Sequence, residues 1–171
     1  MNNSTFRLSV CAVFLLAFSM KASAQSSATA TATATIVTPI TITKTSDMNF
    51  GNVAVQASTG GTVVMTAAGV RTPTSGVTLP GAAGTVSAAS FTVNGQSGYT
   101  YAITLPASVT LTDAASHSMN VSNFTSTPTA TGTLTGGTET LNVGATLNVV
   151  AAQAAGVYTS ATPFTVTVNY N

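Results

Sequence analysis

The residue types that most often perform catalysis are scarce in this sequence. His117 is the single histidine, and Asp113 lies four residues before it. Together with a serine, these two side chains could supply the base and the orienting carboxylate of a Ser-His-Asp group. However, the chain contains no G-x-S-x-G segment to present such a serine, and His117 falls on the polar side of a strand whose inward residues are Met119 and Val121. We therefore predict a solvated surface histidine and no catalytic residues.

The other chemically versatile residues are too dispersed to form a metal or cofactor site. The acids Asp47, Asp113 and Glu139 are far apart in the sequence, so they suggest neither a ligand set nor a pair of glycosidase carboxylates. The glycine pairs do not form a G-x-G-x-x-G or G-x-x-x-x-G-K phosphate cradle. We expect a protein that is not an enzyme, with no cofactor-binding site and no metal site.

The first 24 residues have the pattern of a secretory signal peptide. A polar lead carrying one positive charge is followed by an apolar run at 8–18 and by Ala22-Ser23-Ala24, an A-x-A-type cleavage site. The apolar run is about half the length that a membrane span requires. We expect cleavage after Ala24, which removes the only cysteine, Cys11, and leaves a single domain at 25–171. The predicted location is the periplasm, the cell surface or the extracellular space, with no membrane span after cleavage.

Charge is nearly absent from the predicted mature chain. It keeps two cations, Lys44 and Arg71, and three acids. Binding to nucleic acid needs clustered lysines and arginines that displace counterions from phosphates, so we exclude a nucleic-acid partner. Threonine makes up about a fifth of the mature chain and, like valine, it favours strands.

Apolar and polar residues alternate with a period of two through almost the whole mature chain, which predicts strands. The clearest runs are 28–36, 99–105, 141–149 and 164–170. One run breaks phase at Phe124, which predicts a bulge near Ser122 and Asn123. Asn94–Gly98 and Thr135–Thr138 carry turn residues and are expected to close hairpins. The fold class is all-β, an antiparallel immunoglobulin-like or pilin-like β-sandwich of about 9–10 strands.

Several motifs occur in the order found in one bacterial family. They are Asp47–Gly51, Phe91–Gly95, Tyr99–Pro106, Leu141–Leu147, Gly156–Tyr158 and Phe164–Asn171. Over about residues 30–171 the chain resembles the secreted family catalogued as domain of unknown function 4402. The resemblance implies an exported β-sandwich protein similar to fimbrial subunits in size and composition.

The C-terminus resembles that of chaperone–usher pilins. Those pilins end in an alternating apolar strand with a penultimate aromatic residue, and Tyr170 has that place here. The resemblance implies assembly by strand addition, in which an extended segment of one subunit completes the sheet of the next. Residues 28–37 are the candidate donor strand. Their inward face is mostly alanine, however, and we expect this segment to be the first strand of its own sandwich.

Two hypotheses for function follow. The first is a non-catalytic exported structural protein of the cell surface, a fimbria-like subunit whose partner is itself or another surface subunit. The second is a monomeric adhesin that binds a glycan or a host-surface receptor through loops at 70–84 or 94–98. Tyr99 and Tyr101 could stack on a sugar, but their place in an apolar stripe favours core packing.

Overall fold

The computed structural model describes residues 24–171, and the compact part of the chain begins at Ile36. The predicted signal peptide lies outside the described residues except for Ala24. Alternating β-branched and apolar residues form strands, as the sequence predicts, and an all-β sandwich is confirmed. The described residues contain twelve strands rather than nine or ten. These are β1 (Thr41–Ser46), β2 (Ala54–Val55), β3 (Gly61–Met65), β4 (Arg71–Pro73), β5 (Val77–Thr78), β6 (Ala89–Asn94), β7 (Thr100–Thr104), β8 (Ser108–Thr112), β9 (Ser118–Thr127), β10 (Thr131–Thr133), β11 (Thr138–Val149) and β12 (Thr167–Tyr170).

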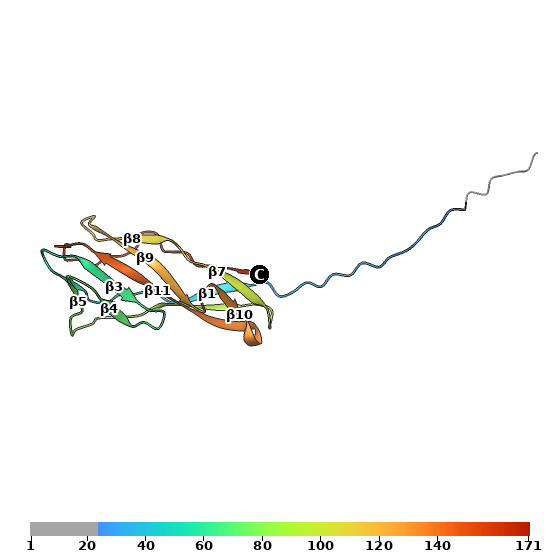
Figure 1. The fold of residues 1–171 in the computed structure, drawn as a ribbon, viewed down its shortest axis with the longest axis horizontal. Helices are drawn as coiled ribbons and strands as arrows, with labels where there is room; N and C mark the ends of the chain where they lie inside the picture. Colours follow the sequence, from blue (N-terminus) through green and yellow to red (C-terminus); the bar gives the residue numbers. More distant parts are fainter. Residues whose placement is uncertain (1–23) are drawn as a thin grey trace, which may run out of the picture. The chain divides into compact units, whose positions relative to one another are not determined.

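The larger sheet is organised around β11, its longest strand. On one side, the first half of β11 pairs with β6 and its second half pairs with β3. On the other side it pairs with β9, which in turn pairs with β8. β1 adds to β6 and β4 adds to β3. All of these pairs are antiparallel, and Figure 1 shows β3, β9 and β11 side by side.

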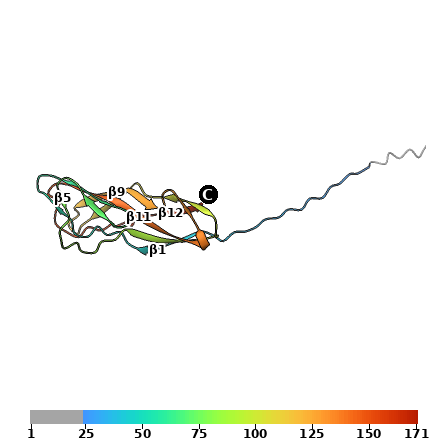
Figure 2. The same ribbon diagram turned by 60° about the horizontal axis from the view of Figure 1, so that its bottom comes forward.

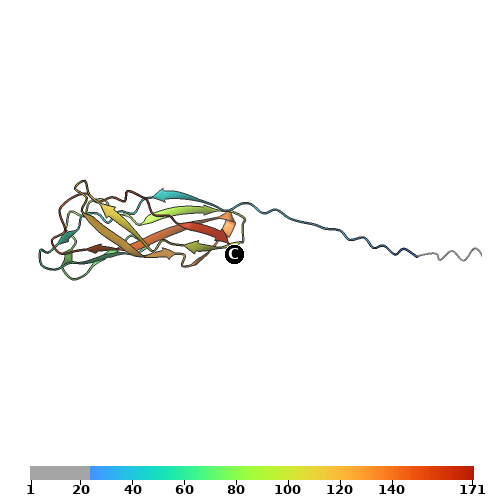
Figure 3. The ribbon, with the colours of Figure 1, turned by 90° about the horizontal axis from the view of Figure 1, so that it is seen from above.

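The second layer is smaller. Its main sheet has the order β10-β7-β12, and a separate two-stranded sheet joins β2 to β5. Figure 2 shows β12 near β11, at the end of the sandwich opposite β5. Turned further, the ribbon shows the two layers lying over one another (Figure 3). The two parts of the second layer therefore cover different ends of the larger sheet.

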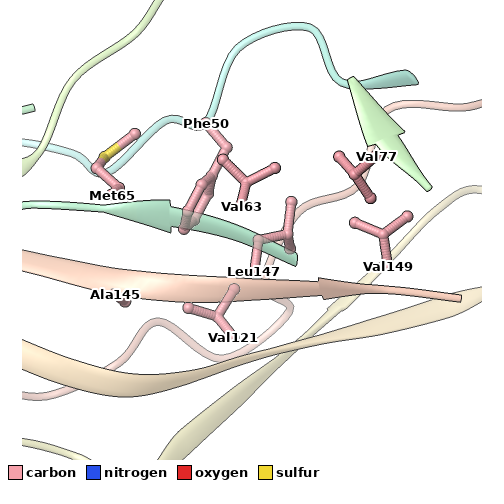
Figure 4. Packing of buried hydrophobic residues seen from close by; sticks show 8 residues of the cluster. All are labelled: Phe50, Val63, Met65, Val77, Val121, Ala145, Leu147 and Val149. Carbon is pink, nitrogen blue, oxygen red and sulfur yellow. The ribbon is translucent and has the colours of Figure 1, made fainter. Parts of the chain in front are cut away.

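Two clusters of buried side chains lie between the layers. The first includes Val63, Val121 and Leu147, and Figure 4 shows that strands β3, β9 and β11 present these side chains on one face, with Phe50 packed against them. The second lies under β7 and β12 and includes Tyr101, whose exposed fraction is 0%. Because β11 contributes residues to both clusters, it links the two halves of the core.

Two predicted hairpins are wrong. β6 and β7 flank Asn94–Gly98, but they belong to different sheets, and so do β10 and β11, which flank Thr135–Thr138. Both segments are crossovers between layers, and the Gly95 N–H donates to the Gly137 carbonyl at 3.0 Å, which holds the two crossovers together. The predicted bulge is confirmed, because the register between β9 and β11 shifts at Gly144–Thr146 and Asn123 has a positive φ of 50°.

The expected strand at 28–37 is also not found. Within the described residues the first strand begins at Thr41, and residues 24–36 form no strand and have exposed side chains. The exposed fraction of Ile36 is 91%. The alternating pattern of this segment is compatible with a strand, but a strand also requires a neighbour to pair with.

Candidate functional site

The strand order matches an immunoglobulin-type sandwich with one position empty. In that fold, one sheet has the order A-B-E-D and the other contains C, F and G. Here β1, β6, β11 and β9 lie in the first order, and β7 pairs with β12 in the place of C and F. Within the part of the chain that the structure describes, no strand pairs with the outer edge of β12, where strand G belongs. Both β1 and β12 are edge strands.

A groove lies at this empty position. It has a volume of about 1000 Å³, and its two walls are segments that are distant in the sequence. The first wall consists of Lys44 and residues 46–55, which continue β1. The second consists of residues 153–160 with Pro163 and Phe164, which precede β12. We refer to this feature below as the groove.

The floor of the groove is apolar. It is formed by side chains on the inner face of the larger sheet, from β6, β8, β9 and β11: Ala89, Phe91, Val109, Leu111, Met119, Val121, Leu147 and Val149. Phe91, Val109, Leu111 and Met119 are only partly buried, although they face the core side of the sheet. The second layer is therefore incomplete over these residues.

Tyr170 lies outside the groove lining, at the end of the sandwich where β12 approaches β1, which we call the closed end. Its hydroxyl donates to the Thr38 carbonyl at 2.7 Å and accepts from the Gln96 N–H at 2.6 Å. The Thr38 N–H and hydroxyl both donate to Gln96 Oε1, at 3.3 and 3.2 Å. Cα atoms of β1 and β12 lie within 8 Å of each other, which is less than the roughly 10 Å that an inserted strand needs between its two neighbours. We call this set of hydrogen bonds the Tyr170 latch.

The walls are held from outside the groove. Arg71 donates from one guanidinium nitrogen to the carbonyls of Phe50 and Asn52, which fixes the first wall. In the second wall, Thr159 forms an isolated two-bond bridge with Thr112 of β8, at 2.9 and 3.0 Å. One wall is thus held by the Arg71 side chain, which does not line the groove, and the other by a backbone bridge to β8.

His117 and Asp113 come together, but at the turn between β8 and β9. His117 Nδ1 lies 2.8 Å from Asp113 Oδ2, and the other carboxylate oxygen accepts from the backbone N–H groups of Ala115 and His117. The hydrogen bond from the His117 side chain, more than any other contact, lowers the pKa of Asp113. Asp113 also lies against Gly156 of the second wall. Among the described residues, no serine hydroxyl hydrogen-bonds the imidazole.

The two tyrosines proposed as a sugar platform do not form one. Tyr101 is fully buried, and burial, followed by the nearby Glu139 carboxylate, raises the pKa of its phenol well above the usual range. Tyr99 is partly exposed and packs edge-on against Tyr170, with ring centroids 5.6 Å apart. Core packing is thus the role of Tyr101.

The two loops proposed for glycan binding contribute backbone hydrogen bonds or strands to the fold itself. In the 94–98 crossover, the N–H groups of Gly95, Gln96 and Gly98 all donate to partners within the protein. The 70–84 segment contains β4 and β5. Across residues 24–171 no group of three or more His, Cys, Asp or Glu side chains is placed to hold a metal ion. The same residues include no helix long and apolar enough to cross a membrane.

These features define a β-sandwich of immunoglobulin-type strand order with one strand position unfilled. Residues 40–170 match the family model described as "Domain of unknown function (DUF4402)", and the chain belongs to this family. No curated protein and no solved structure gives a match. The match begins one residue before β1, so the alternating segment 28–37 precedes the matched region.

The groove was not foreseen from the sequence. Its walls and floor come from segments that lie as far apart in the sequence as Lys44 and Phe164. No local pattern marks a strand position that stays empty. One sequence signal is related to the groove. The alternating pattern at 28–37 predicts a strand, and the structure shows no strand there.

Proposed function

We propose that this protein is a non-catalytic, exported structural subunit of the cell surface that assembles in the manner of fimbriae. The observation that carries the proposal is the groove at the empty strand position. A strand placed there would lie between the first wall, which continues β1, and the second wall, which precedes β12, and it would cover the apolar floor. Adding a strand from another chain is an established way to complete a sheet.

Composition and the N-terminal pattern also support this proposal. The predicted signal peptide would bring the chain to the compartment in which surface subunits assemble. His117 and Asp113 lie together at the turn between β8 and β9, but among the described residues no serine hydroxyl hydrogen-bonds the imidazole, so the geometry gives no specific support to a Ser-His-Asp enzyme. Nothing specific favours the alternative of a glycan-binding adhesin, which stays a prediction that a glycan array can test.

The test is the association state of the mature chain, residues 25–171. Sedimentation velocity and electron microscopy over a range of concentrations should show oligomers that grow with concentration. Leu111→Glu places a charge on the floor of the groove and should abolish them. The matched control is Thr110→Glu, which puts the same charge on the exposed side of β8 and should leave them unchanged.

Circular dichroism should show that both variants keep their β-structure. A chain that remains monomeric at every concentration, or a Leu111→Glu variant that assembles as well as the Thr110→Glu variant, would contradict the proposal.

A further inference from the structure

We infer that the strand entering the groove is the segment 28–37 of a second copy of this protein, and that a chain does not fill its own groove with this segment. The inference rests on the proposed function and identifies the partner for the groove described above. It depends on the length of segment 28–37, on its side chains, on the exposure of Ile36 and on the path of the backbone at the Tyr170 latch.

The length of the segment suits the groove. The first wall extends from Lys44 to Val55, which is twelve positions. A ten-residue strand spans roughly 33 Å, at about 3.3 Å per residue. Residues 28–37 are therefore long enough to extend along most of the groove.

The chemistry of the segment also suits the groove. Residues 28–37 carry no charge, and Ala30, Ala32, Ala34 and Ile36 lie on one face of an extended chain, with threonines on the other. The floor already contains large side chains such as Phe91, Leu111 and Met119. Small alanines let a backbone approach such a floor closely, and Ile36 is the largest apolar side chain on this face of the segment.

The exposure of Ile36 is a further reason to expect a partner. Among the large hydrophobic residues of the described chain, Ile36 has the highest exposed fraction, 91%. Its exposure leaves the apolar face formed by Ala30, Ala32, Ala34 and Ile36 available to a neighbouring molecule.

The Tyr170 latch disfavours insertion into the same chain. It holds Thr38 beside Gln96, and Thr41 is already paired with Asn94 three residues later. From Thr38 the backbone thus continues along β6 into β1 and does not turn back.

Filling its own groove would require the chain to reverse direction at residues 36–37. Such a reversal would place residue 35 opposite Thr38 and residue 29 opposite Lys44.

Such a reversal would leave most of the segment at the wrong place. Residues 30–35 would lie along the closed end, where β1 and β12 are too near each other to admit a strand. Only residues before 30 would reach the groove. A second copy, whose segment can enter from outside, does not have this restriction.

Disulfide trapping tests the inference on the mature chain, which has no cysteine once the predicted signal peptide is removed. One protein carries Ala32→Cys, and a second, size-tagged protein carries Leu111→Cys. Mixing and mild oxidation should give a mixed disulfide-linked dimer, and an excess of synthetic peptide 28–37 should reduce its yield. Thr31→Cys or Thr33→Cys, on the opposite face, should give far less, because a disulfide requires Cβ atoms within about 4.5 Å.

A single chain carrying both Ala32→Cys and Leu111→Cys separates the two routes. Disulfide-linked ladders support the inference, whereas a monomer closed by its own disulfide overturns it. If the mixture gives no dimer while the unmodified chain still forms oligomers that Leu111→Glu abolishes, the groove takes another strand and only this inference fails. If Leu111→Glu has no effect on assembly, the proposed function fails as well.

Discussion

At the scale of single residues, Gly132 shows how little room the core leaves around Tyr101. A Cβ atom at Gly132 would overlap the buried tyrosine ring, whereas one at Gly81 would meet nothing within 4 Å. Neither glycine has a positive φ, so the comparison isolates packing. We expect Gly132→Ala to lower the free energy of unfolding by about 1–3 kcal/mol and Gly81→Ala to leave it nearly unchanged. Urea denaturation of both variants measures the difference, and equal midpoints would contradict this account.

The Asp113 carboxylate gives a prediction about pH at the same scale. Its pKa in the folded protein is below the ordinary value of 3.8, chiefly through the hydrogen bond with the His117 side chain. The ionised form therefore stabilises the fold above about pH 4, and this contribution is lost as the pH falls through the lowered pKa. Asp113→Asn should destabilise the protein at pH 7 and less so at pH 3. The control is Asp47→Asn, which alters an exposed carboxylate 2.7 Å from Lys44. Chemical denaturation at pH 7 should show a smaller loss of stability for this variant than for Asp113→Asn.

At the scale of elements, β11 connects the two core clusters, and this leads to a prediction about cooperativity. Leu141 belongs to one cluster and Leu147 to the other. Leu141→Ala should lower the free energy of unfolding by about 2–5 kcal/mol and should weaken amide protection at residues 145–149 as much as near residue 141. Val150→Ala, at a position with an exposed fraction of 63%, should change little. Hydrogen exchange that weakens only around residue 141 would show that the two clusters unfold independently.

The crossovers at 94–98 and 135–138 show where local sequence stops being informative. Asn94-Gly95 has the residues of a hairpin turn, yet β6 pairs with β1 and β11, and β7 pairs with β10 and β12. Whether two neighbouring strands pair or change layers depends on long-range partners, which turn residues do not specify. The strands themselves, and the bulge at Asn123, followed from local alternation because each depends on which residues face the core. The groove did not, since it is defined by a strand position that remains empty.

At the scale of the whole molecule, the shortage of charge predicts how assembly responds to salt. Lys44 and Asp47 are the only charged residues that line the groove, and residues 28–37 have none. Association should therefore depend on apolar burial and backbone hydrogen bonds, which sodium chloride screens little. We expect sedimentation profiles to be nearly the same at roughly 20 mM and roughly 500 mM sodium chloride, which lie below and above physiological ionic strength. A strong decrease in oligomer size with added salt would indicate an electrostatic interface elsewhere on the surface.

The two open edges described above also expose the isolated chain to uncontrolled aggregation. Unpaired strand edges recruit any extended segment they meet, and natural sheets limit this with lysines, bulges and short strands. β1 carries Lys44 and a register irregularity between Lys44 and Ser46, and β12 is only four residues long. These features discourage indiscriminate growth without filling the groove. If the protein assembles as proposed, these features would limit aggregation of the single chain until a second chain pairs with its open edges.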